Sequence, residues 1–184
     1  MANKVFRIII GIAILAGIAI GGWMILPGSV KNPLLASYQE KTDDNYLKIV
    51  DALKASTVPK NKKVTFGAMM EGMSEDSCWT IEKTFVDDAG NGTYRVYADA
   101  YKVTVSVENA NNDDGMVTHT NAHVRIMFDV SKNGETLTIG KKDVVAGKPA
   151  TPIQVEVGEY VYSPTADYFQ PTLDCLAGMA TAEE

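Results

Sequence analysis

The two histidines of the chain, His119 and His123, are the first candidates for chemistry because they lie four positions apart. On a helix this spacing could bind a metal ion. The residues around them, including Val117 and Val124, are typical of an extended chain instead. Four residues of strand place the two rings about 13 Å apart, which is too far for them to share one ion. We therefore predict a polar strand face at these histidines and no metal site.

Three methionines, Met69, Met70 and Met73, lie close together beside acidic residues. Thioether sulfur is a soft ligand that suits Cu(I), so these methionines are a candidate copper site on a loop that we expect over residues 71–76. Methionine also fills irregular gaps in a core or contacts a partner. We favour this second interpretation and expect neither a metal nor another cofactor.

The sequence contains no motif that marks a catalytic centre. It has no GxSxG segment, and no cysteine is supported by a neighbouring histidine. The glycines at positions 11, 17, 21 and 22 lie in an apolar stretch and form no phosphate-binding loop. We expect no catalytic residues and no enzymatic activity.

The chain has two cysteines, Cys78 and Cys175. In a single domain outside the cytoplasm, such a pair is most simply a disulfide. In the chain-entropy model, closing a loop of about 100 residues contributes up to about 4–5 kcal/mol to stability. We predict this disulfide; the alternative is two unpaired, buried thiols.

One apolar segment near the N-terminus determines on which side of a membrane we expect these residues. Nineteen uncharged residues, Ile8 to Leu26, directly follow Lys4 and Arg7. This length is enough for a helix to cross the hydrocarbon core of a bilayer. The basic residues ahead of it predict a cytoplasmic N-terminus and a C-terminal domain in the periplasm or outside the cell. A cleaved signal peptide is the alternative, although its only passable cleavage site, residues 19–21, lies inside the apolar run.

Small residues recur along one face of this predicted span. Ala13, Gly17 and Gly21 are four positions apart, and the last two form a GxxxG motif. Such a face lets two helix backbones approach closely. We predict that it packs against another membrane helix.

The rest of the chain has the charge and length of one soluble domain. Residues 1–26 hold two of the 17 basic residues and none of the 23 acidic ones, so the remainder carries a net charge near −8. A domain of this charge does not suit binding to nucleic acid.

The apolar pattern of this domain changes from a helical period to alternation. A helix capped by Thr42 presents Tyr46, Leu47, Val50 and Leu53 on one stripe. From residue 64 on, short alternating segments predict strands, with a bulge at residues 99–100 and a hairpin at residues 133–134. A final segment after residue 163 is expected to break at Pro171.

These patterns predict a mainly β fold with short flanking helices and one N-terminal transmembrane helix. The β domain is expected to be an antiparallel sandwich or a curved meander. The expected divisions are a cytoplasmic tail (1–7), a transmembrane helix (8–26), a juxtamembrane connector (27–41), an extracytoplasmic β-rich domain (42–180) and a disordered tail (181–184).

An N-terminal apolar helix, a β-sheet and a C-terminal disulfide broadly resemble the architecture of type IV pilins. The resemblance implies a filament subunit. That family is processed at a glycine just before the apolar helix and has a glutamate at the fifth position of the mature helix. The segment Arg7 to Gly11 does not supply this pattern.

The function that these features favour is a non-catalytic, single-pass accessory or scaffold subunit of a membrane protein complex. Its expected partners are other membrane subunits, bound through the helix and the β domain, and the lipid bilayer. The alternatives are a pilin-like filament subunit and a periplasmic binding protein for copper or another small ligand.

Overall fold

The computed structural model describes residues 23, 25–108 and 115–180. The chain divides into two units, one ending at Lys31 and one beginning at Asn32, and the second unit holds the β-sheet. Most of the predicted span over 8–26, with Ala13, Gly17 and Gly21, lies outside the described residues. Within the residues described, no helix combines the length and the apolar character needed to cross a membrane.

The described elements follow one another in the order two helices, hairpin, helix, sheet and helix. They are α2 (Gly28–Thr42), α3 (Asp44–Lys54), β1 (Thr57–Val58), β2 (Asn61–Thr65), α4 (Phe66–Met73), β3 (Cys78–Val86), β4 (Gly92–Glu108), β5 (Met116–Asn133), β6 (Thr136–Ile139), β7 (Lys142–Asp143), β8 (Gln154–Val157), β9 (Tyr160–Tyr162) and α5 (Phe169–Met179). The segment predicted as a connector over 27–41 is thus mostly helix α2.

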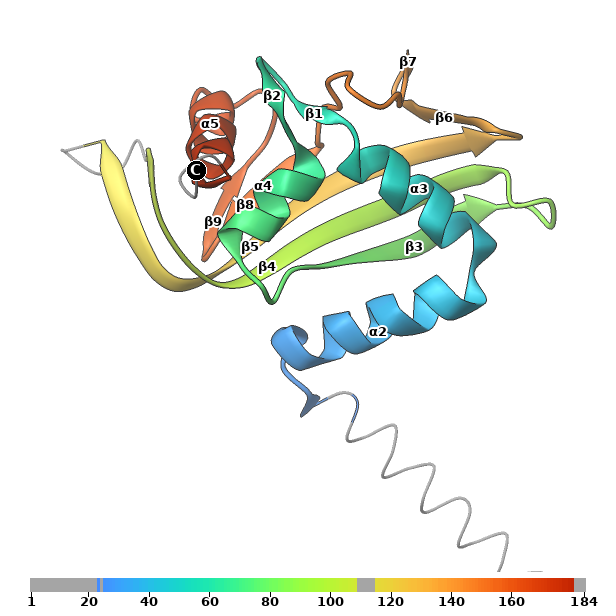
Figure 1. Cartoon of the computed structure of the whole chain (residues 1–184), viewed down its shortest axis with the longest axis horizontal. Helices are drawn as coiled ribbons and strands as arrows, with labels where there is room; N and C mark the ends of the chain where they lie inside the picture. Colours follow the sequence, from blue (N-terminus) through green and yellow to red (C-terminus); the bar gives the residue numbers. More distant parts are fainter. Residues whose placement is uncertain (1–22, 24, 109–114, 181–184) are drawn as a thin grey trace, which may run out of the picture. The chain divides into compact units, whose positions relative to one another are not determined.

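The predicted mainly β fold is confirmed, since strands hold 43% of the residues that the structure describes and most of them form a seven-stranded antiparallel sheet. Strands β3 to β6 each pair with the next strand along the chain, while β8 pairs with β5 and β9 pairs with β8 (Figure 1). The hairpin predicted at residues 133–134 is also confirmed, as the turn between β5 and β6, where Gly134 has φ +57°.

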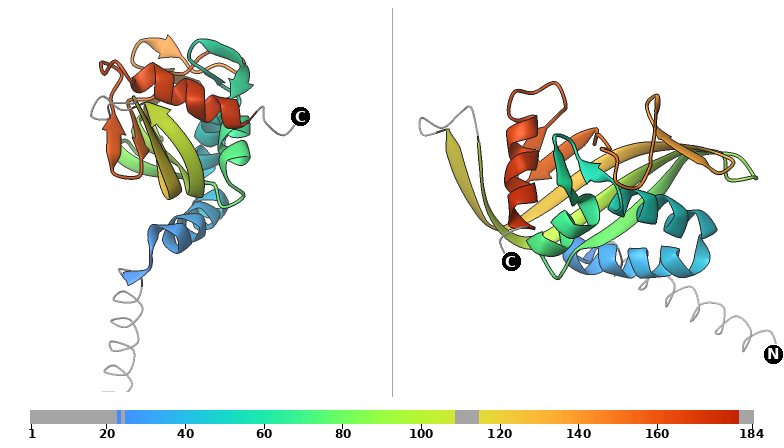
Figure 2. Two further views of the ribbon diagram at one scale, coloured as in Figure 1. Left: turned by 90° about the vertical axis from the view of Figure 1, so that its left-hand side faces the viewer. Right: turned by 45° about the horizontal axis from the view of Figure 1, so that its top comes forward.

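Helices α3, α4 and α5 pack against the same face of the sheet (Figure 2). Alternation on β4 sends Tyr94, Val96 and Ala98 into the core, where each is fully buried. Phe66 of α4 meets Phe128 of β5 edge to face, with ring centroids 5.0 Å apart. The core therefore lies between one face of the sheet and the three helices.

The two longest strands, β4 and β5, bend together at a pair of bulges. Lys102 on β4 and Asn121 on β5 have φ of 60° and 55°, values that non-glycine residues rarely adopt. The register shifts on both sides of Val103, which pairs with Ala122. Beyond this point the strands curve upward beside α5 (Figure 1). The bulge predicted at residues 99–100 is confirmed, but it lies two residues further along the strand, at residues 101–102.

The strand and loop predicted over residues 64–76 were wrong, because helix α4 occupies most of this segment. The hydroxyl of Thr65 accepts a hydrogen bond from the backbone N–H of Ala68 and so caps the helix. Met69 and Met70 are fully buried, and Met73 is 6% exposed. The methionines recur at helical spacing and fill the core beneath β4.

Two predicted helix ends also differ from the structure. Helix α3 is capped by Asp43, whose carboxylate accepts from the backbone N–H of Asn45, and not by Thr42. Helix α5 runs unbroken through Pro171. Proline is tolerated there because it lies in the first turn, where the helix needs no backbone N–H from it.

The predicted disulfide is wrong, because Cys78 and Cys175 are both free. Cys78 packs with Ala36 and Tyr101 in a small cluster on the outer face of the sheet. Cys175 is on α5, which packs against the main core on the opposite face. The sheet itself therefore separates the two thiols.

We expect two free thiols in the purified protein. Alkylation in denaturant without reductant should add two adducts to the intact mass, and prior reduction should not change this number. If no adduct forms without reductant and two form only after reduction, Cys78 and Cys175 are joined by a disulfide and this prediction is wrong.

Candidate functional site

Helix α2 is held against the unpaired edge of strand β3 by the side chain of Gln39, which makes the two hydrogen bonds that a neighbouring strand would make. The amide of Gln39 donates to the backbone carbonyl of Ile81 and accepts from the N–H of the same residue. On the following helix, the hydroxyl of Tyr46 donates to the carbonyl of Trp79 at 2.9 Å. Backbone groups on an unpaired edge would otherwise be open to another strand. The bonds of Gln39 thus hold α2 at this edge of the sheet, and the bond of Tyr46 holds α3 beside it.

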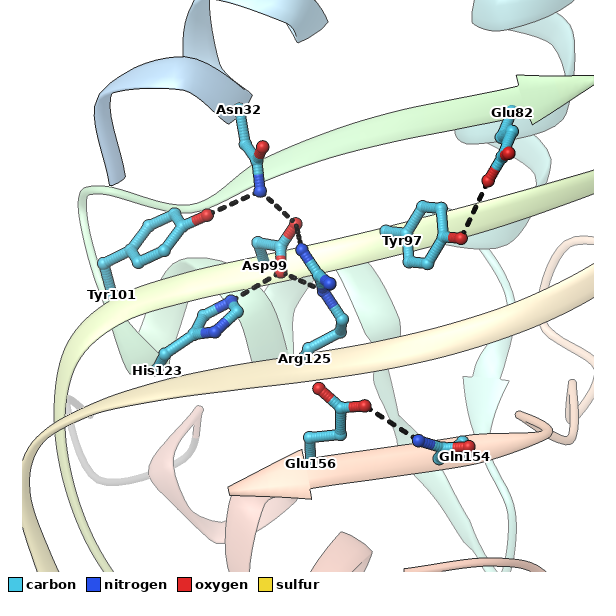
Figure 3. Close-up of polar contacts among 9 residues, drawn as sticks. All are labelled: Asn32, Glu82, Tyr97, Asp99, Tyr101, His123, Arg125, Gln154 and Glu156. Carbon is cyan, nitrogen blue, oxygen red and sulfur yellow. Dashed lines mark hydrogen bonds and ion pairs between the residues drawn. The ribbon is translucent and has the colours of Figure 1, made fainter. Parts of the chain in front are cut away.

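The outer face of the sheet carries a row of polar side chains that starts beneath α2. Cys78 on β3 pairs with Asp99 on β4, which pairs with Arg125 on β5, which in turn pairs with Glu156 on β8. Residues directly opposite one another lie close enough for their side chains to interact. The register of four strands therefore places these residues side by side, and Figure 3 shows three of them, Asp99, Arg125 and Glu156.

Asp99 is the centre of this site, and its side chain is fully buried. Its Oδ1 accepts from Nε of Arg125 at 2.7 Å and from Nε2 of His123 at 2.6 Å. Its Oδ2 accepts from Nη2 of Arg125 at 3.2 Å and from Nδ2 of Asn32 at 3.1 Å. Because an ionised carboxylate only accepts, His123 carries its proton on Nε2. Three side chains from two elements thus converge on one carboxylate (Figure 3).

These donors keep Asp99 ionised. Burial acts most strongly on its pKa and raises it, but the hydrogen bonds from His123 and Arg125, with the charge of Arg125, together outweigh burial. The net result is a pKa below the ordinary value. Burial also acts most strongly on the pKa of Arg125 and lowers it, but the hydrogen bond to Asp99 and the negative charges of Asp99 and Glu156 together outweigh burial and raise this pKa.

Asn32 and His123 join the carboxylate to Tyr101. The Nδ2 group of Asn32 donates to the hydroxyl of Tyr101 at 2.7 Å as well as to Asp99. The ring of Tyr101 stacks on that of His123, with centroids 4.7 Å apart and planes 6° apart. Burial raises the pKa of the Tyr101 hydroxyl, and the charge of Asp99 raises it further. This hydroxyl is therefore a neutral hydrogen-bonding group and not a base.

On its other side, the guanidinium of Arg125 lies over the ring of Tyr97, 4.9 Å from the centroid. The hydroxyl of Tyr97 donates to Oε2 of Glu82 at 2.9 Å. The network thus extends across β3, β4 and β5 and holds the arginine from two sides.

The thiol of Cys78 lies beside this network but is not activated by it. Burial raises its pKa to about 12, the negative charge of Asp99 acts in the same direction, and Arg125 opposes both. A thiol is a nucleophile only as the thiolate, so Cys78 is chemically quiet at neutral pH. Among the described residues Cys78 makes no hydrogen bond to His123, whose Nε2 is bonded to Asp99, so this cysteine, histidine and aspartate do not form a nucleophile with its base.

A cleft of about 310 Å³ opens next to Cys78, between α2, α3, α4 and the start of β3. Glu40 and Glu71 line it together with Lys54. In the part of the chain that the structure describes, no three His, Cys, Asp or Glu side chains are close enough to hold a metal ion. The cleft therefore offers mixed charges but no convergent set of ligands.

The structure brings together few of the residues that the sequence singled out. His123 joins the Asp99 network, whereas His119 lies further along β5 and packs edge-on against Tyr160. Met69, Met70 and Met73 line the core, as described above.

Sequence reasoning missed Asn32, Asp99, Tyr101 and Arg125. A signal for the central pair was present, because Asp99 and Arg125 each interrupt an apolar strand pattern. Each also lies ten residues from its own end of the polar turn at 109–115. A symmetrical hairpin about that turn places the two charges opposite each other.

In comparisons with known proteins, no family model matches the chain, and no curated protein or solved structure is significantly similar to it. The site must therefore be interpreted from its own geometry.

We expect Asp99→Asn to lower the free energy of unfolding by about 3 kcal/mol, because it leaves Arg125 half-buried without its counter-charge. Urea unfolding at pH 7 measures the effect. Glu82→Gln is the matched control, since it removes an exposed carboxylate of the same face, and it should cost less than about 0.5 kcal/mol. Equal effects of the two substitutions would contradict the central role of Asp99.

The contribution of Asp99 to the free energy of unfolding should decrease as the pH falls. Its pKa is lower in the folded protein than its ordinary value of 3.8, so the unfolded chain takes up the proton first as the pH falls. The contribution is complete above the ordinary pKa and is lost as the pH falls below it towards the folded pKa. The gap in unfolding free energy between the wild type and Asp99→Asn should therefore narrow below about pH 4. A gap that is constant from pH 7 to pH 2.5 would contradict this.

Proposed function

We propose that the chain is a non-catalytic, single-pass, membrane-anchored scaffold or accessory subunit of a membrane protein complex. Its β domain is the interaction module and lies in the periplasm or outside the cell. The finer architecture in this proposal is a curved antiparallel meander joined to a transmembrane helix over residues 8–26.

The observation that carries the proposal is the short connection between the apolar run and the folded domain. The run ends at Leu26, helix α2 begins at Gly28, and from Asn32 on the helix is hydrogen-bonded to the sheet. No long, flexible linker separates the two parts, as a freely diffusing catalytic domain on a tether would need. Such a connection suits a subunit that must hold a domain close to the membrane.

The chemistry of the Asp99 network also supports a structural role. Its carboxylate has four donors, its tyrosine hydroxyl has a raised pKa, and the neighbouring thiol is protonated. A general base or a nucleophile needs a pKa close to the working pH and a free lone pair. The hydrogen bonds of this network are instead made within the protein and join α2 to β4 and β5.

We expect Gly17→Leu to weaken the assembly of this subunit with its partners, because a large side chain prevents close approach of two helix backbones. Blue-native electrophoresis of mild-detergent extracts should show the subunit shifting from a larger complex to the free form. The control Ile18→Leu changes a neighbouring bulky position and should leave the complex intact. Neither substitution should alter urea unfolding of the domain, and a wild-type chain that migrates only as a free monomer would contradict the proposal.

A further inference from the structure

Helix α2 has two opposite faces with different surroundings. Asn32, Ala36 and Gln39 face the sheet, where the two polar residues make the hydrogen bonds described above and Ala36 packs on Cys78. Positions two residues apart on a helix lie about 200° apart around its axis. Leu34, Tyr38 and Lys41 therefore share the opposite face.

Two apolar side chains on this outer face are not covered by the rest of the domain. The side chains of Leu34 and Tyr38 are 52% and 63% exposed, although each lies in a well-formed helix. Because Asn32 and Gln39 fix the rotation of α2, the helix cannot turn these side chains inward without breaking its bonds to Asp99 and Ile81. The exposure is thus built into the fold.

We propose that the outer face of α2, formed by Leu34, Tyr38 and Lys41, lies on the lipid surface of the bilayer that residues 8–26 enter. This inference rests on the proposed membrane anchor. In this arrangement the leucine and the tyrosine ring lie among the upper acyl chains and the lysine extends towards the headgroups.

The position of α2 in the chain favours lipid as the occupant. Leu34 is eight residues beyond the end of the apolar run, and Tyr38 is twelve, which correspond to about 12 and 18 Å of helix. Pro27 and Gly28 lie between the run and the helix and allow the chain to turn there. The face is therefore within reach of the membrane surface when α2 lies along it.

The side chains around the junction are those found at membrane interfaces. The ammonium group of Lys31 lies over the ring of Trp23, 5.8 Å from its centroid. Tyrosine and tryptophan are enriched where hydrocarbon meets headgroups, and a lysine can cover apolar surface with its stem while its ammonium group stays in water. Helix α2 carries Lys31 and Lys41 against one acidic residue, Glu40, so the helix is weakly basic although the domain as a whole is acidic.

The size of the exposed face argues against a protein as its sole occupant. A stable protein interface buries about 800 Å² on each partner, far more than two side chains on one helix provide. A membrane contact needs no such area, because the anchor already holds the helix at a high effective concentration near the lipid.

The test places a fluorescent reporter on this face in the full-length protein. Tyr38→Trp is made in a Trp23→Phe background and reconstituted into phosphatidylcholine nanodiscs with and without brominated acyl chains. The remaining tryptophan, Trp79, is 4% exposed in the core and stays unquenched. Phe85→Trp in the same background is the matched control, since Phe85 is an apolar residue of β3 that is 79% exposed but not on α2. Equal urea midpoints for both variants and their parent verify the fold.

The proposal expects a loss of fluorescence in brominated nanodiscs for Tyr38→Trp and none for Phe85→Trp. If the protein floats with vesicles but the indole at position 38 is not quenched, the lipid contact is refuted while the anchor stands. Quenching at both positions would show general adhesion of the domain and would also refute it. A photo-crosslink from position 38 to protein, without quenching, would assign the face to a protein partner. If the full chain does not float with vesicles, the anchor and the inference both fail.

Discussion

The buried charge of Asp99 constrains more of this structure than any other single group. A carboxylate without solvent must be fully hydrogen-bonded, because an unpaired buried charge costs several kcal/mol. Its donors come from α2 and β5, so the charge is satisfied only when helix, strand and register are all correct. A slip of β5 by one residue would move Arg125 to the core face and leave Asp99 uncompensated. The network therefore specifies one register of the sheet. Two of its donors are on β5, the strand that pairs with both β4 and β8.

The bend of the sheet is compatible with this register because its two bulges offset each other. An extra residue on β4 near Lys102 is matched by one on β5 near Asn121, so the pairs on both sides of the bend have the same summed residue numbers and therefore the same register. Asp99 and Arg125 stay opposite each other below the bend, while Val105 and His119 do so above it. The strands can thus curve around α5 without disturbing the charged pair. Left-handed conformations at two non-glycine residues are the strain that this curvature requires.

The sequence predicted the parts of the fold that depend on local periodicity and turn chemistry. Alternation identified most long strands, and Asn133–Gly134 identified the hairpin between β5 and β6. Helix α4 was missed because its eight residues are mostly buried, so that apolar side chains appear at both strand and helix spacing. The disulfide was wrong because two cysteines in a sequence give no information about which face of a sheet each occupies. The Asp99 network depends on the register of β4 and β5 and on the docking of α2, which are tertiary features that local sequence patterns do not show. The spacing of Asp99 and Arg125 along the central hairpin was nevertheless a usable signal for that pair.

Helix α2 connects these constraints to the proposed function. Because its inner face completes the Asp99 network and covers the edge of β3, the helix belongs to the domain and cannot serve as a loose tether. Its outer face remains apolar for the same reason, since the bonds of Asn32 and Gln39 leave it no rotation that would bury Leu34 and Tyr38. One helix thus bonds to the sheet on one side and leaves Leu34 and Tyr38 exposed on the other, which is the surface that we propose for lipid. If α2 were only a linker between two independent parts, neither its hydrogen bonds to the sheet nor the fixed exposure of Leu34 and Tyr38 would be explained.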